Sequence, residues 1–175
     1  MGVSPYVVIA AAAVLVAFVV WACLRKEDRK FDERQLQKRA NAFRCGFFSM
    51  IGGNLLMMIL FSWKTWTDRV DNMFTIIVVF MTAVVVFAVY SILNDAFFGN
   101  KENPKGYLGI CLVVLFCNSM IVIRHFMQNG TLLQDGKVTM TPCTNLVMVV
   151  VFLIIALSII VKMILNQREV SDEEP

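Results

Sequence analysis

The hydrophobic and polar positions of the chain form five long apolar runs separated by short polar connections. The runs cover residues 5–24, 43–63, 73–93, 107–126 and 142–165. A helix of about 20 apolar residues is long enough to cross the hydrocarbon core of a bilayer. The pattern therefore predicts an all-α polytopic membrane protein, with five transmembrane helices in a single integral membrane domain over residues 1–175.

Helix-start signals accompany two of these runs. Ser4 precedes Pro5 and Thr141 precedes Pro142, so a hydroxyl side chain at the N-cap position stands before a first-turn proline in both cases. No basic segment precedes the first run, and no small-residue cleavage site follows it. We therefore expect the first run to remain in the protein as a helix.

The polar segment after the first run predicts another helix start. Asp32 is placed to act as the N-cap, and Gln35 at the N3 position would complete a capping box. Phe31 and Leu36, at the N′ and N4 positions, have the spacing of a hydrophobic staple. We expect a helix to begin here and to continue into the second run.

Residues 32–43 have the pattern of an amphipathic extension on the cytoplasmic side. An apolar residue recurs every three or four positions over residues 36–47, which gives one apolar stripe. Arg34, Lys38 and Arg39 lie away from that stripe. Two interpretations stay open: these cations contact anionic lipid headgroups, or they form a docking surface for a cytoplasmic protein partner.

The composition supports a membrane protein and excludes several soluble classes. Hydrophobic residues make up 58% of the chain and charged residues 17%, and the mean hydropathy is +0.70. Soluble domains hold about 45–50% apolar residues. Because the apolar surplus has to face lipid, we exclude a soluble enzyme, a nucleic-acid-binding protein and a disordered tail.

The distribution of Lys and Arg predicts the orientation of the chain. One side holds twelve of these residues: Arg25, Lys26, Arg29, Lys30, Arg34, Lys38, Arg39, Arg44, Lys101, Lys105, Lys162 and Arg168. The other side holds four: Lys64, Arg69, Arg124 and Lys137. Positively charged segments stay in the cytoplasm. We therefore expect the N-terminus outside and the C-terminus, with the acidic tail 166–175, inside.

Few residues could carry catalysis or bind a metal ion. The five Cys residues, at positions 23, 45, 111, 117 and 143, include no pair at zinc-ligand spacing, and His125 is the single histidine. No ionisable residue lies near the middle of a run, and neither an HExxH motif nor a catalytic pair of carboxylates occurs. We expect no catalytic residue, no metal and no cofactor.

Two amides interrupt the apolar runs at similar depth. Asn54 lies eleven residues into the second run, and Asn118, beside Ser119, lies eleven residues into the fourth. If these helices are neighbours, the two amides can form an interhelical hydrogen bond. The alternative is that each amide bonds to the backbone of its own helix.

Asp95 follows the third run at the cation-rich side. A carboxylate at a helix C-terminus opposes the helix dipole, so a compensating cation is expected. We predict an ion pair from Asp95 to Arg39 or Arg44, which would tie the third helix to the base of the second. The alternative is a solvated Asp95.

The connection between the fourth and fifth runs has the pattern of a small external hairpin. Asp135 and Gly136 separate two short segments that contain Leu, Val and Thr. An Asp-Gly pair at this position is typical of a two-residue hairpin turn.

Several short motifs together resemble a family. They are Asp32, Glu33, Arg34 and Gln35, followed by Arg39, Ala40 and Phe43; Asn94, Asp95, Ala96, Phe97 and Phe98; and Asp135, Gly136 and Lys137. The chain resembles a group of uncharacterised small multi-pass membrane proteins of clostridial-type Gram-positive bacteria that carry a DERQ motif after the first helix. It departs from them at Lys38 and Arg39, where the group tends to have Gly and Lys. The resemblance implies a bacterial plasma membrane.

The features taken together favour a non-catalytic membrane protein that acts as an accessory or regulatory component through a protein partner. The partners we expect are anionic headgroups of the inner leaflet and an unidentified protein, with a second copy of the chain as a further candidate. The alternative function is a subunit of a transporter or channel. Its path would form between chains and would be lined by Asn54, Asn118, Ser119 and Thr82.

Overall fold

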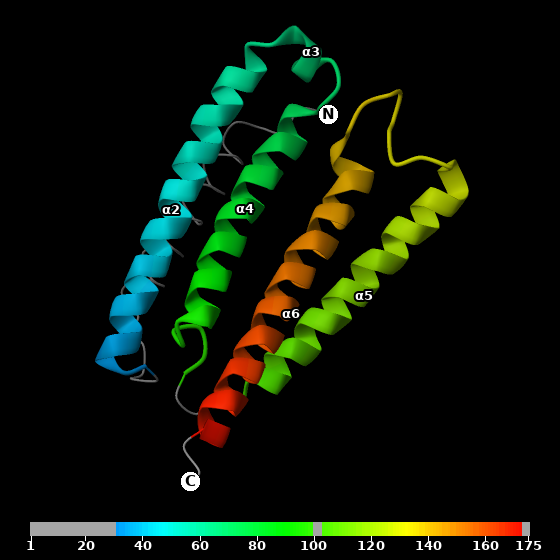
Figure 1. Cartoon of the computed structure of the whole chain (residues 1–175). Coiled ribbons are helices and arrows are strands. Elements are labelled where there is room, and N and C mark those ends of the chain that lie inside the picture. The colour runs from blue at the N-terminus through cyan, green and yellow to red at the C-terminus, as the bar shows by residue number, and fades with distance from the viewer. Residues whose placement is uncertain (1–30, 100–102, 173–175) are drawn as a thin grey trace, which may run out of the picture. The chain divides into compact units, whose positions relative to one another are not determined.

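The computed structural model describes residues 31–99 and 103–172, so the first predicted span, residues 5–24, and its Ser4-Pro5 start lie outside the described residues. The described part is all-helical (Figure 1) and contains α2 (Glu33–Phe61), α3 (Lys64–Thr67), α4 (Asn72–Leu93), α5 (Pro104–Asn129) and α6 (Met140–Asp172). Within it, α2, α4, α5 and α6 are long and apolar enough to cross a membrane. This is the architecture of an all-α, multi-pass membrane protein.

The four long helices are longer than the apolar runs from which they were predicted. The predicted extension 32–43 and the second span form one continuous helix, α2. The last helix, α6, begins at Met140, two residues before Pro142, so the proline lies inside the first turn, where backbone N–H groups have no acceptor within the helix. It also runs through Asp172, well into the predicted tail 166–175, because neither Gly nor Pro interrupts residues 163–174.

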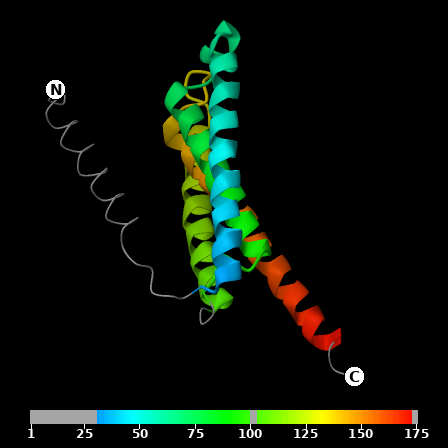
Figure 2. The same cartoon turned by 90° about the vertical axis from the view of Figure 1, so that its left-hand side faces the viewer.

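The four long helices are arranged in a row. Helix α2 packs on α4, α4 packs on α6, and α6 packs on α5. In Figure 1 the order α2, α4, α6, α5 is visible from left to right. Helices α2 and α4 run in opposite directions, as do α6 and α5, whereas α4 and α6 run in the same direction. Figure 2, which turns this view by 90°, shows that the last turns of α6 extend beyond the ends of its neighbours. As a result α2 and α5 occupy the two outer positions.

Close contact between α2 and α4 depends on small residues. Ala42 and Gly46 are the buried residues of α2. A Cβ atom at Gly46 would lie 3.2 Å from the backbone oxygen of Ala83, and a Cβ atom at Gly53 would lie 2.9 Å from Val79 Cγ1. Such small residues let two membrane helices approach closely.

The main hydrophobic cluster joins α4, α5 and α6. Its buried members are Ala88, Ile92, Cys111, Val151, Ile155, Ala156 and Ile159. The chain after α4 covers one end of this cluster with Phe97 and Phe98, whose rings lie 6.1 Å and 5.2 Å from the ring of Tyr107 at the start of α5. We call this end of the row, where α2 begins and α4 ends, the Asp95 end.

The opposite end, called the hairpin end, is formed by the connections 62–71 and 130–139. Asp135 and Gly136 have φ angles of 51° and 75°, and Gln134 and Lys137 exchange two backbone hydrogen bonds across them. The predicted Asp-Gly turn is therefore present, but within the described residues the hairpin is a single bridge pair and not a pair of strands. Val138 also bonds to the backbone of Arg69 and Asp71, which joins the two connections.

Candidate functional site

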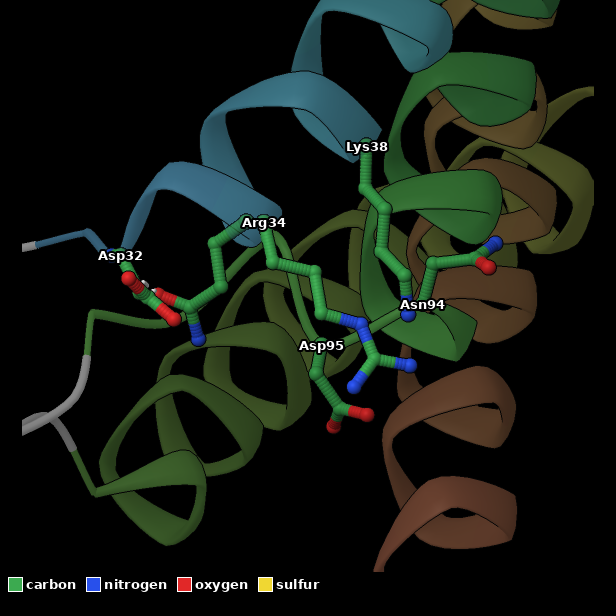
Figure 3. Close-up of a pocket in the computed structure, with 6 residues that line it drawn as sticks. Asp32, Arg34, Lys38, Asn94 and Asp95 are labelled. Atoms are coloured by element: carbon green, nitrogen blue, oxygen red, sulfur yellow. Dashed lines mark hydrogen bonds between the residues drawn. The ribbon is translucent and has the colours of Figure 1, made fainter.

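A pocket at the Asp95 end brings charged and polar side chains together. It has a volume of about 250 Å³ and lies where the start of α2 meets the residues after α4. The side chains that line it, shown in Figure 3, are Asp32, Arg34, Gln35, Lys38, Asn94 and Asp95. Four of these six side chains are ionisable, which is why we treat this pocket as the candidate site.

The start of α2 is held by a capping box. Asp32 Oδ1 accepts a hydrogen bond of 2.7 Å from the backbone N–H of Glu33, and Gln35 Oε1 accepts one of 3.2 Å from the backbone N–H of Asp32. The Asp32 side chain also accepts from the N3 backbone, so both halves of the predicted box are present. The box fixes the first turn of α2, which carries Arg34.

The predicted staple partners lie on either side of this cap. The ring of Phe31 lies 4.5 Å from the guanidinium carbon of Arg39, which is a cation–π contact. Leu36 is 45% exposed. The staple between Phe31 and Leu36 stays a prediction, and Arg39 is the partner of Phe31 that the structure describes.

Asp95 ends helix α4 in a strained backbone conformation. Its φ angle is 58°, the left-handed region that glycine usually occupies after a helix. The N–H of Ala96 bonds to the Ser91 carbonyl at 2.8 Å, and the N–H of Asp95 bonds to the Ile92 carbonyl at 3.3 Å. These two bonds define a Schellman motif with Asp in the position where Gly is expected.

The partner of Asp95 is Lys162 of α6, and not Arg39 or Arg44 as predicted. Lys162 Nζ lies 2.7 Å from Asp95 Oδ2, and the lysine side chain is only 13% exposed. The prediction of Arg39 or Arg44 was wrong because it joined α4 to α2, whereas α6 also packs against α4 at this depth. A sequence signal did exist, since Lys162 is the single charge in residues 142–165.

Arg34 and Lys38 face the same pocket from successive turns of α2. Their spacing of four residues places both on one side of the helix. In Figure 3 both side chains extend toward Asn94 and Asp95. Among the described residues, neither forms an ion pair. The pocket therefore has two cations that remain unneutralised after Asp95 has paired with Lys162.

The amides at membrane depth do not meet. Asn54 and Asn118 each donate a 2.8 Å hydrogen bond to a carbonyl of their own helix, that of Met50 and of Val114. The predicted contact between them is wrong because α4 and α6 separate α2 from α5. Ser119, next to Asn118 on α5, is on the same outer helix, and Thr82 of α4 also bonds its own helix, at Val78.

A second hollow lies between α4 and α6. It has a volume of about 350 Å³ and is lined by aliphatic side chains with Met81 and the single hydroxyl of Thr82. Because that hydroxyl already bonds Val78, the wall offers mainly dispersion contacts.

Within the described ranges, no group of three or more His, Cys, Asp or Glu side chains could hold a metal ion. His125 lies within hydrogen-bonding distance of Asn129, at 3.2 Å, and Cys143 donates to the carbonyl of Leu132. Cys23 lies outside the described residues.

Comparison of the chain with protein-family models, with curated proteins and with solved structures finds no match.

Proposed function

We propose that the protein is a non-catalytic accessory or regulatory component of a bacterial plasma membrane, acting through a protein partner. The observation that supports this proposal is the position of the polar side chains in the described helices. At membrane depth, Asn54, Thr82, Asn118 and Ser158 each donate to a carbonyl of their own helix. The ionisable groups lie at the ends of the row. A partner can therefore bind through charged groups only at these ends of the described helices.

The proposal includes five spans, with the N-terminus outside and the C-terminus in the cytoplasm. The distribution of cations supports this orientation. In the described part, the Asp95 end and the adjoining helix ends hold seven cations: Arg34, Lys38, Arg39, Arg44, Lys105, Lys162 and Arg168. The hairpin end and its adjoining helix ends hold four: Lys64, Arg69, Arg124 and Lys137. The end richer in Lys and Arg is assigned to the cytoplasm. The assignment to a bacterial plasma membrane rests on the family resemblance.

The experiment compares partner contact with solute flux. A photo-crosslinking amino acid replaces Gln37, which is exposed near the Asp95 end, and in a control protein it replaces Gln128, which is exposed near the hairpin end. In native membranes we expect one adduct of constant mass from position 37 and none from position 128. Purified protein in vesicles should conduct no more K⁺, H⁺ or Cl⁻ than empty vesicles.

Two results would contradict the proposal. Flux through vesicles that is lost in Asn118→Leu or Thr82→Val would favour the transporter or channel subunit. Equal adducts from positions 37 and 128 would also contradict a partner at the Asp95 end.

A further inference from the structure

We infer that the pocket at the Asp95 end binds the headgroup of an anionic phospholipid, with Arg34 and Lys38 holding its phosphodiester. This inference stands on the pocket alone and does not depend on the proposed partner.

The pocket and its edge carry a net positive charge. The pocket and its edge contain three cations, Arg34, Lys38 and Lys162, and two carboxylates, Asp32 and Asp95. Both carboxylates are already engaged, Asp32 by the first turn of α2 and Asp95 by Lys162. Arg34 and Lys38 form no ion pair among the described residues, so the pocket has room for one more negative group.

The hydrogen-bond donors of the pocket are spaced to reach one phosphate group. Arg34 and Lys38 lie four residues apart on one side of α2, a spacing that lets both reach a single phosphate. A guanidinium can donate two parallel hydrogen bonds to phosphate oxygens, and an ammonium adds a compact charge. Gln35 adds its amide N–H groups, since its Oε1 atom is occupied by the N–H of Asp32.

The pocket lies at the end of a membrane-spanning helix. The pocket lies directly after Leu93, the last residue of the apolar helix α4, and at the start of α2. Ends of membrane-spanning helices lie at the level of the lipid headgroups. A phosphodiester is therefore the anion that a bilayer supplies at this level, and its acyl chains can continue along the apolar helices.

Asp95 can contact the rest of the headgroup. Lys162 pairs with Asp95 Oδ2, and the Asp95 side chain is 54% exposed. The other carboxylate oxygen, Oδ1, is therefore available to a headgroup. This oxygen accepts hydrogen bonds from a headgroup that has hydroxyl donors. A glycerol headgroup provides such donors and choline does not, so phosphatidylglycerol fits the pocket better than phosphatidylcholine.

The test uses the full chain in nanodiscs that contain equal amounts of phosphatidylglycerol and phosphatidylcholine. Native mass spectrometry counts the lipids that stay bound to the protein after release. We expect phosphatidylglycerol to be retained about tenfold over phosphatidylcholine, on the scale of one or two charge-assisted hydrogen bonds. In Arg34→Gln combined with Lys38→Gln the ratio should fall close to one.

The matched control is Lys105→Gln. Lys105 is an exposed cation at the same end of the row, at the start of α5, and it does not line the pocket. If this variant loses as much selectivity for phosphatidylglycerol as the double variant does, the total positive charge determines binding. That result would overturn the specific site.

Two further measurements test whether the pocket binds the phosphodiester of a lipid. Asp95→Asn removes a negative charge from the pocket but keeps an amide oxygen that can accept from the headgroup hydroxyls, so it should bind phosphatidylglycerol several-fold more tightly; weaker binding would contradict an anion site. Inorganic phosphate at millimolar concentration should not displace the lipid. Displacement would assign the pocket to a soluble phosphate compound and would overturn the lipid as its ligand.

Discussion

Asp95 combines a backbone conformation that is unfavourable for its side chain with an ion pair that depends on that side chain. A non-glycine residue in the left-handed region costs about 1 kcal/mol relative to glycine. The carboxylate at this position reaches Lys162 Nζ at 2.7 Å, across the contact between α4 and α6. Because the lysine is 13% exposed, the pair lies in a partly desolvated setting, which makes it stronger than a pair in open water.

The ion pair can be measured by a double-mutant cycle with Asp95→Asn and Lys162→Met. Asn tolerates the left-handed backbone and Met keeps the length of the lysine stem, so the cycle isolates the charge interaction. We expect a coupling of about 0.5–1.5 kcal/mol in the free energy of unfolding, measured by reversible denaturation in mixed micelles.

The matched control for this cycle is Asp135→Asn. Asp135 also has a positive φ angle, 51°, but it lies at the hairpin end. Its coupling to Lys162→Met should be zero within error. A coupling of zero at Asp95 as well would mean that the ion pair contributes nothing to stability.

At the scale of single helices, the features predicted best from the sequence are local ones. The capping box at Asp32 and Gln35 depends on residues within four positions of each other, and so does the turn at Asp135 and Gly136. Both could be predicted because no distant residue takes part. The contact between Asn54 and Asn118 could not, because it depends on the order of the helices in the row. Lys162 was missed as the partner of Asp95 for the same reason.

The N-cap of α2 gives a prediction at this scale. Replacing Asp32 with Ala removes the acceptor for the first-turn N–H groups and should weaken the start of the helix by about 0.5–2 kcal/mol. Amide hydrogen exchange over residues 34–40 should therefore become faster. Asp32→Asn is the control, since Asn also caps helices well and should leave the exchange nearly unchanged.

Two adjacent glycines of α2 provide a second prediction. A Cβ atom at Gly53 would lie 2.9 Å from Val79 Cγ1, whereas one at Gly52 would meet nothing within 4 Å. Both Gly→Ala changes gain the same helix propensity, so the difference between them reports the contact of α2 with α4. We expect Gly53→Ala to be less stable than Gly52→Ala by about 1–3 kcal/mol, the usual cost of overpacking. Equal stabilities would mean that this contact is looser than the distances indicate.

At the scale of the whole molecule, the row of helices predicts which cysteine pairs can form a disulfide bond. Gly53 and Val79 have a Cβ separation of 3.6 Å once a Cβ atom is added to Gly53, which lies within the range for disulfides. In a protein without its native cysteines, Gly53→Cys with Val79→Cys should form an intramolecular bond on mild oxidation. Asn54→Cys with Asn118→Cys should form none. A bond in the second pair would place α2 beside α5 and contradict the row.

The orientation of the row in the membrane can be tested at its two ends. Gln37, near the Asp95 end, and Lys137, in the connection at the hairpin end, are both exposed. Because the Asp95 end carries more Lys and Arg, it should face the cytoplasm, where such segments are retained. In a cysteine-free background, a membrane-impermeant maleimide added to intact cells should label Lys137→Cys. It should label Gln37→Cys only after the cells are opened. The reverse pattern would invert the orientation, and labelling of both sites in intact cells would show that the chain inserts in both directions.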